Sequence, residues 1–402
     1  MARRTARERL VGTLDGLEVL GLSVLLLGLS WSEAAKSAGL ALAVLALLGR
    51  LALGGRLRPP ARSTFALLGC YVAASALSVA LAPPGLSGPG EVLSLLMTVA
   101  AFPLAADVCR RRPSRRLMLA YAIVAGAAVG AVLGYADHLS GDYRRLVLPS
   151  IENAVPAGEY LAAVIGLAVP LLLAEAGSTV VGPMLGLSVG LYALAMFLTR
   201  SRGPMLGAAA GGLLALWLAI SRRWVPLVAA AALVVGVAVF GALNPASRVV
   251  RDGVAGSRSA GLRARTWAVS LDLIAERPLT GHGEGSFANL DVRFVDELGV
   301  TWEQNAHNVL LHELVETGVL GAGALVGFVV LGLRDLVRAL RRSRRGLERA
   351  VSVGCLAGVA ALLVCGVVSV STDAEPGILL FALLGLGASV PPPGEAAAEG
   401  GR

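Results

Sequence analysis

The side chains best suited to chemistry lie in residues 301–333, where a long polar segment passes into an apolar run. This stretch carries two of the chain's four histidines, His307 and His312. On a helix, Asn308, His312 and Glu316 follow one another at four-residue spacing and form a polar stripe. The adjoining side carries His307 with apolar and small residues, namely Leu311, Leu314, Gly318 and Gly321. Polar groups that enter a membrane are costly and usually functional, so we expect the functional centre here, with the glycines allowing close helix packing.

A pair of arginines forms a second candidate site, at the point where two apolar runs meet. Residues 199–204 read Thr-Arg-Ser-Arg-Gly-Pro and include Arg200 and Arg202. A guanidinium group binds two phosphate oxygens at once, so the pair predicts an anion clamp. Arg202 is favoured because it adjoins the start of a helix. The alternative is that both side chains snorkel from the membrane into water.

A third group lies in the polar segment that precedes the histidines. It contains Arg263, Arg265 and Trp267 within five residues. Their position on an expected loop helix indicates substrate binding, whereas the alternative is a set of surface salt bridges, which contribute little to stability.

The four histidines are not equivalent candidates. A lone histidine is more often structural than catalytic, but the arginines expected beside His307 favour a role in proton transfer. His312 either supports that site or packs in the helix. His282 in a glycine-rich turn and His138 near the end of an apolar run are expected to be non-catalytic.

Several familiar chemistries have no signature in this sequence. It has no nucleotide-binding glycine loop, no Asp-x-Asp pair and no Cys-x-x-Cys motif, and its four cysteines lie in or beside apolar runs. We therefore expect no cofactor and no metal. The energy for a reaction must come from an activated substrate, and on the outer face of a membrane this suggests a lipid-linked donor.

Composition defines the class of protein. Of the 402 residues, 56% are hydrophobic and the mean hydropathy is +0.73, which together indicate a polytopic helical membrane protein. The net charge of +8 comes almost entirely from arginine. In a membrane protein such charge reports topology rather than nucleic-acid binding. The first apolar run is expected to be a membrane anchor rather than a cleaved signal.

Twelve apolar runs predict twelve membrane spans. They are residues 12–30, 34–53, 63–82, 91–108, 116–138, 157–175, 179–198, 203–220, 224–242, 307–333, 349–370 and 377–390. Arginines concentrate in alternate loops, which predicts that both termini are cytoplasmic. The expected domains are helices 1–9 in residues 1–242, an outer loop domain in 243–306, helices 10–12 in 307–390 and a disordered tail in 391–402.

The outer loop domain has its own predicted order. Residues 262–274 show helical spacing, and Arg277-Pro278 is expected to end that helix. Residues 281–285 read Gly-His-Gly-Glu-Gly and predict a tight turn.

Short motifs in this region resemble the O-antigen ligase and polymerase superfamily. They are Ser201-Arg202-Gly203, Arg263 with Trp267, L-I-x-E-x-P-L at 273–279, G-x-G-x-G-S-F at 281–287, and Ala306-His307-Asn308 followed by Gly318 and Gly321. The resemblance covers about residues 195–335. Ala324 stands where the ligase branch often has Gly, Thr or Val.

The resemblance implies a membrane glycosyltransferase with a GT-C-like all-helical fold in the bacterial inner membrane. It implies inverting, metal-independent transfer of a glycan from undecaprenyl diphosphate to an acceptor hydroxyl, such as that of lipid A-core or another glycan, on the periplasmic face. His307 would activate or orient the acceptor, and Arg202 and Arg263 would hold the diphosphate. From the residues themselves, we also expect Arg200, Arg265, Trp267, Asn308 and His312 to contact substrate. A polymerase of the same superfamily is the first alternative. A membrane transporter is the second, although the polar residues do not gather at mid-bilayer.

Overall fold

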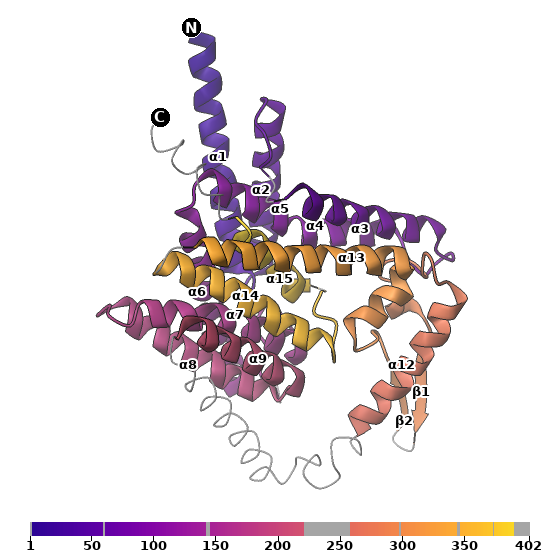
Figure 1. The fold of residues 1–402 in the computed structure, drawn as a ribbon. Helices are drawn as coiled ribbons and strands as arrows, with labels where there is room; N and C mark the ends of the chain where they lie inside the picture. Colours follow the sequence, from indigo (N-terminus) through magenta and orange to yellow (C-terminus); the bar gives the residue numbers. More distant parts are fainter. Residues whose placement is uncertain are drawn as a thin grey trace.

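The computed structural model describes residues 2–58, 61–141, 145–220, 258–296, 299–343, 346–372 and 374–389. Helices dominate this part of the chain (Figure 1). The helices are α1 (Ala2–Gly28), α2 (Glu33–Ala52), α3 (Arg62–Leu81), α4 (Pro89–Val99), α5 (Ala101–Arg111), α6 (Arg115–Ser140), α7 (Ala154–Ala174), α8 (Val181–Thr199), α9 (Arg202–Ala219), α12 (Arg258–Glu276), α13 (Val309–Arg342), α14 (Leu347–Gly366) and α15 (Ala374–Gly387).

Within the described residues, nine helical runs are long and apolar enough to cross a membrane. The protein is therefore a polytopic membrane protein, as its composition predicts. The runs correspond to the expected spans 1–7, 10 and 11, with α4 and α5 counted together as Pro89–Arg111. Helix α4 gives way to α5 at Ala100. Pro103 lies in the first turn of α5, and its ring excludes the carbonyl of Val99 from a regular helix.

Three of the twelve expected spans have a different outcome. Residues 203–220 form α9, an 18-residue helix that falls outside the nine candidates. Residues 224–242 lie outside the described residues. So do residues 243–257 of the predicted loop domain and the predicted tail, 391–402. Residues 377–390 overlap α15, a helix of 14 residues. At about 1.5 Å per residue it spans roughly 21 Å, which is shorter than the hydrocarbon core of a bilayer.

Helices α7 and α14 form the centre of the bundle, where small residues bring their backbones together. A Cβ atom added to Gly166 would stand 2.8 Å from the backbone nitrogen of Gly358, and one added to Gly358 would stand 2.9 Å from the carbonyl of Ala163. Helix α9 approaches α14 in the same way, because a Cβ on Gly211 would lie 2.7 Å from the carbonyl of Ala357. Such contacts are typical of helix packing in membranes. They fix the start of α9 beside the end of α14.

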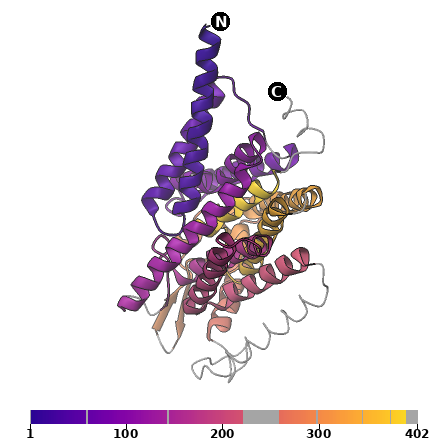
Figure 2. The same ribbon diagram turned by 90° about the vertical axis from the view of Figure 1, so that its left-hand side faces the viewer.

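The connections gather at two opposite ends of the bundle. We call one the site end; it holds the connections α1–α2, α3–α4, α6–α7, α8–α9 and α14–α15. Helix α12 lies beside the first turns of α13 there (Figure 1). Backbone hydrogen bonds join these connections, for example Leu146 N to Leu198 O at 3.1 Å. In Figure 2 the hairpin of α1 and α2 lies along one side of the bundle and the first turns of α1 project beyond it.

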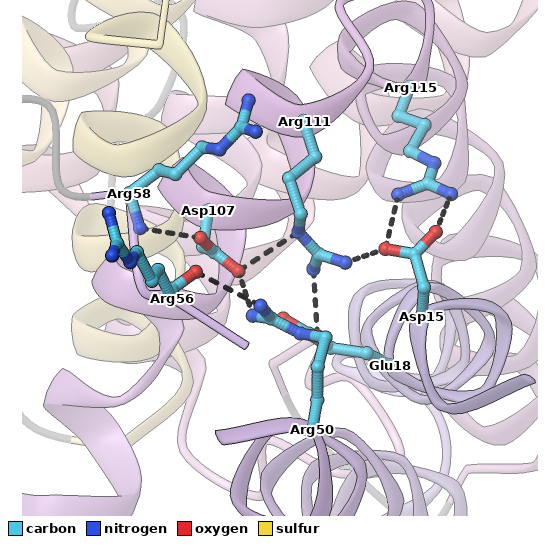
Figure 3. A network of polar contacts seen from close by, with 8 residues as sticks. All are labelled: Asp15, Glu18, Arg50, Arg56, Arg58, Asp107, Arg111 and Arg115. Atoms are coloured by element: carbon cyan, nitrogen blue, oxygen red, sulfur yellow. Dashed lines mark hydrogen bonds and ion pairs between the residues drawn. The ribbon is translucent and has the colours of Figure 1, made fainter. Parts of the chain in front are cut away.

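The opposite end, which we call the network end, is held by buried charges (Figure 3). Glu18 of α1 accepts from Arg50 of α2 at 3.0 Å and from Arg111 of α5 at 2.7 Å. Asp107 of α5 also pairs with Arg50 and Arg111, and Arg111 and Arg115 both pair with Asp15. Three carboxylates therefore balance three guanidinium groups. Removing one partner would leave a charge buried and unpaired, so the network ties α1, α2, α5 and α6 together.

The segment between α12 and α13 combines predicted and unpredicted structure. Helix α12 contains the predicted helix at 262–274 and ends at Glu276, before Arg277-Pro278. A short 3-10 helix, η1 (Phe287–Asn289), follows the glycine turn. Strands β1 (Arg293–Asp296) and β2 (Gly299–Trp302) then form an antiparallel hairpin that pairs Arg293 with Trp302. The sequence analysis predicted helix in this loop and made no prediction for the hairpin, although a stretch that contains Phe, Val, Thr and Trp favours strands.

Candidate functional site

His307 stands immediately before α13 rather than on it. Its φ of +50° is left-handed, and its backbone N–H donates to Asn305 Oδ1 at 3.0 Å. Asn308 begins the helix as its N-cap and accepts from Leu311 N at 3.0 Å. The amide of Asn308 also donates to the carbonyl of Val367 at 3.0 Å. The expectation that His307 shares a helix face with Leu311 is therefore wrong, since the helix starts two residues later.

The side chain of His307 is paired with a carboxylate. Its Nε2 lies 2.7 Å from Oε2 of Glu303, and the two side chains are 30% and 10% exposed. When Nε2 carries the proton and donates a hydrogen bond to Glu303, the other ring nitrogen, Nδ1, keeps its lone pair. Nδ1 can then accept a proton. Sequence reasoning did not single out Glu303. Its four-residue spacing from a histidine is the signal that points to it.

Arg263 of α12 joins this pair to Arg202 of α9. Burial lowers the pKa of Arg263, the charge of Arg202 lowers it further, and the charge of Glu303 raises it. Arg263 Nε is buried and has no hydrogen-bond partner within the described structure. Arg263 therefore lies within electrostatic reach of both Arg202 and Glu303, and Glu303 contacts His307; we call these four residues the histidine–arginine centre.

The two neighbours of Arg263 in the predicted group lie differently. Trp267 follows one turn later on the same side of α12, and its buried indole N–H also lacks a partner among the described residues. Arg265 is exposed and points away, because two residues along a helix are about 200° apart. The structure thus places Trp267 with Arg263 and places Arg265 apart from them.

The turn between α8 and α9 presents Arg200 and Arg202, both of which are exposed. Arg200 ends α8 with a φ of +54°, and Arg202 is the first residue of α9. Arg145, from the connection between α6 and α7, holds this turn by donating to Thr199 O at 2.7 Å and to Ser201 Oγ at 2.7 Å. Burial lowers the pKa of Arg145, and the charge of Arg200 lowers it further.

Sequence reasoning gave Arg145 no role at the site. The signal for it is an arginine in a connection that is not one of the arginine-rich alternate loops. With Arg145, four guanidinium groups gather at the site end, and Glu303 is the carboxylate whose charge acts on Arg263. Such an arrangement favours an anion, and its forked donors suit phosphate oxygens.

Helix α13 breaks at Gly318, and the glycine-rich turn docks into the break. Gly318 has φ +64° and ψ −168°. His282 N donates to Val315 O at 2.9 Å, and Val319 N donates to Pro278 O at 2.9 Å. A Cβ atom on Gly318 would stand 2.4 Å from the carbonyl of Leu279. The expected close packing at Gly318 therefore occurs, but through a break in the helix rather than along a regular face.

Two polar residues of the first half of α13 support the docked turn. The Glu316 carboxylate accepts from the backbone N–H groups of Gly285 and Phe287, each at 2.9 Å. His312 is buried, with Nε2 3.5 Å from Glu316 Oε1 and its ring 5.4 Å from that of Phe287. His312 thus lies against the turn that carries η1 and faces Glu316 rather than His307.

Fold and site together define a polytopic membrane protein with a cationic, histidine-bearing centre at one end of its helices. Residues 187–326 match the family described as O-antigen ligase, so the chain carries a domain of the O-antigen ligase family, whose members are membrane enzymes that transfer glycans. The resemblance read from the sequence motifs is confirmed, and the match includes Arg202, Arg263 and His307. A comparison with curated proteins gives no match.

Proposed function

We propose that the protein transfers a glycan from undecaprenyl diphosphate to a hydroxyl group of an acceptor such as lipid A-core. The observation that carries this proposal is the histidine–arginine centre, where α9, α12 and the segment before α13 bring together Arg202, Arg263, Glu303 and His307. A proton acceptor beside guanidinium groups matches the needs of transfer from a diphosphate-linked sugar. The membership of the domain in the O-antigen ligase family supports the same reaction class.

The residues divide the reaction between them. Arg202 and Arg263 bind the diphosphate and stabilise the negative charge that develops on it, with Arg200 beside them and Trp267 on the same side of α12. Nδ1 of His307 takes the proton from the acceptor hydroxyl while Glu303 holds the ring. The acceptor oxygen bonds to the anomeric carbon as the bond from that carbon to the diphosphate breaks. Attack from the opposite face inverts the anomeric centre, and undecaprenyl diphosphate leaves as the anion.

The site end faces the periplasm in this proposal. The network end carries Arg50, Arg111 and Arg115 beside the arginine-rich connections, and cytoplasmic loops are enriched in such residues. Both termini are then cytoplasmic, and the GT-C-like arrangement expected from the family places donor and acceptor in the outer leaflet. Asn308 and His312 contribute by shaping the start of α13. Arg265 points away from Arg263 and is the least suited of the predicted residues to contact the substrate.

Reconstitution tests the function directly. Purified protein in liposomes receives a polymer linked to undecaprenyl diphosphate together with lipid A-core, and the products are separated by size. We expect glycan joined to lipid A-core without any added nucleotide or metal. Chain growth on the lipid carrier instead would identify a polymerase. Absence of any transfer, by protein shown to be folded, would contradict both.

A further inference from the structure

A cavity of about 400 Å³ lies at the site end and has so far been given no ligand. It extends from the site end into the bundle between α3, α4, α13 and α15, and the turn that carries η1 covers it. Its base is buried and includes Tyr71, Thr98 and Phe381. Its rim is exposed and includes Ser94 and Gln304. The volume lies in the usual range for small-molecule sites.

The cavity adjoins the reacting groups through the chain itself. Gln304 lies on its rim, and the preceding residue is Glu303, the partner of His307. Consecutive Cα atoms are about 3.8 Å apart. The cavity therefore reaches the residue that adjoins Glu303 in the chain.

Several hydroxyl and amide groups in the walls of the cavity already donate hydrogen bonds within the protein. The hydroxyl of Tyr71 donates to Glu313 at 3.0 Å, and that of Thr98 donates to Ser94 O at 3.2 Å. The hydroxyl of Thr372 donates to Glu313 at 3.5 Å, and Asn289 donates to Leu86 O at 2.9 Å. The oxygens of these side chains keep acceptor capacity. A matching ligand must therefore supply many donors.

The carboxylates in the walls disfavour phosphate as that ligand. Glu91, Glu284 and Glu316 contribute three carboxylates to the lining, whereas the arginines belong to the histidine–arginine centre. Like charges at short range repel. Carboxylates and hydroxyl oxygens, with the ring of Phe381 at the base, instead suit a sugar, whose hydroxyl groups donate and whose carbon face is apolar.

We propose that this cavity binds an uncharged, hydroxyl-rich sugar unit of the acceptor and delivers one of its hydroxyls to His307. The proposal rests on the proposed function and adds where the acceptor sits. It divides the site by charge, with the diphosphate on the arginines and the neutral sugar among the carboxylates.

Saturation-transfer NMR on the full-length protein in nanodiscs tests binding without requiring catalysis. The probes are neutral tetrasaccharides of glucose, galactose, mannose and rhamnose. We expect saturation transfer to at least one of them, and inorganic pyrophosphate, which the arginines would bind, should leave that signal in place. No signal with any probe, or displacement by pyrophosphate, would overturn the proposal.

A matched pair of variants on α4 localises the binding. Ser94 lines the cavity, whereas its neighbour Leu93 is 59% exposed and is not part of the lining. Ser94→Trp should weaken binding at least tenfold and Leu93→Trp should leave it unchanged. Glu91→Ala, a smaller change at an exposed position, should weaken binding about threefold even if Ser94→Trp does not fold. Equal binding in wild type, Ser94→Trp and Glu91→Ala would refute the cavity as the site.

The same experiments separate this inference from the proposed function. Sugar binding that depends on Ser94 but occurs in a protein without transfer activity would contradict the function and keep the cavity. Transfer activity with an acceptor KM that Ser94→Trp and Glu91→Ala do not change would keep the function and reject the cavity.

Discussion

At the scale of single residues, the site depends on one hydrogen-bonded pair and a few guanidinium groups. Glu303 and His307 are 2.7 Å apart, and the charges of Arg202 and Glu303 both act on Arg263. A carboxylate that holds an imidazole fixes both its orientation and which nitrogen carries the proton. The chemistry proposed here therefore predicts different defects for the histidine, its partner and the arginines.

Replacing His307 tests proton transfer. His307→Ala should lower the rate of glycan transfer by about 100-fold or more, the range for loss of a general base. Glu303→Gln keeps the size of the side chain but removes its charge, so it should lower kcat and change the pH profile while the donor KM stays constant. The measurement is transfer by purified protein between pH 5 and 9. Activity of His307→Ala within a few-fold of wild type would contradict proton transfer by His307 and leave it a structural role before α13.

Replacing Arg202 tests the anion clamp. Arg202→Lys keeps the positive charge but loses the planar fork that binds two oxygens. Loss of one charge-assisted hydrogen bond, about 1.5–3 kcal/mol, corresponds to a fall of roughly 10- to 100-fold in kcat/KM for the lipid-linked donor. Arg265→Lys, at an exposed position on the far side of α12 from Arg263, is the matched control and should lose much less. Full activity in Arg202→Lys would contradict the anion clamp and indicate that Arg202 serves only as a positive charge at the membrane interface.

At the scale of elements, the break in α13 positions the turn at residues 278–287 and the start of α13. Gly318 divides the helix, and the turn at residues 278–287 fills the gap with backbone hydrogen bonds. The first half of α13 then holds η1 through Glu316 and starts next to His307. Both the site and the cavity therefore depend on this docking.

Gly318→Ala tests the docking. Gly318 has a backbone conformation that only glycine adopts readily, which costs about 1–3 kcal/mol for another residue, and the added Cβ would meet the carbonyl of Leu279 at 2.4 Å. We expect a lower thermal unfolding temperature and a large loss of activity. Gly323→Ala, on the same helix with nothing within 4 Å of the added atom, should be as stable as wild type. Equal behaviour of the two variants would show that the turn does not dock as described.

The docked turn also predicts a pH dependence. Burial lowers the pKa of His282 below 6.5, and the charge of Arg277 lowers it further, against the opposing charge of Glu276. Below about pH 6.5 the unfolded chain binds a proton that the folded chain resists, so the stability falls as the pH drops. His282→Gln cannot be protonated and should lose less stability between pH 8 and pH 5.5. Unfolding temperatures at both pH values measure this difference; parallel losses would assign the acid sensitivity to other groups.

At the scale of the whole molecule, charge distinguishes the two ends. The network end neutralises Asp15, Glu18 and Asp107 with arginines from α2, α5 and α6. At the site end, the part of the chain that the structure describes shows no ion pair for Arg200, Arg202 or Arg263 within 4 Å. One end thus locks helices together, and the other suits the anionic substrate that we propose.

Reporter fusions test the orientation of these ends. A fusion at Pro84, between α3 and α4, and fusions at Ser257 and Asp373, which lie outside the described residues, should all read as periplasmic. Fusions at Pro113 and Ser343, and at Pro59 outside the described residues, should read as cytoplasmic. A cytoplasmic signal at Pro84 and Ser257 would place the histidine–arginine centre on the wrong side for a lipid-linked glycan and would remove the proposed function.

The sequence by itself determined the class of protein, most of its spans and the residue types of the site. Apolar runs of bilayer length leave little choice but helices, and short motifs single out Arg202, Arg263 and His307 as the candidate site residues. Tertiary structure alone decided the geometry around them. That Arg145 holds the turn before Arg202, that Glu303 pairs with His307 and that Gly318 breaks α13 all depend on contacts between distant segments or on local backbone geometry. Periodicity records which face of an element is apolar, but it does not record which other element meets that face or where a helix begins.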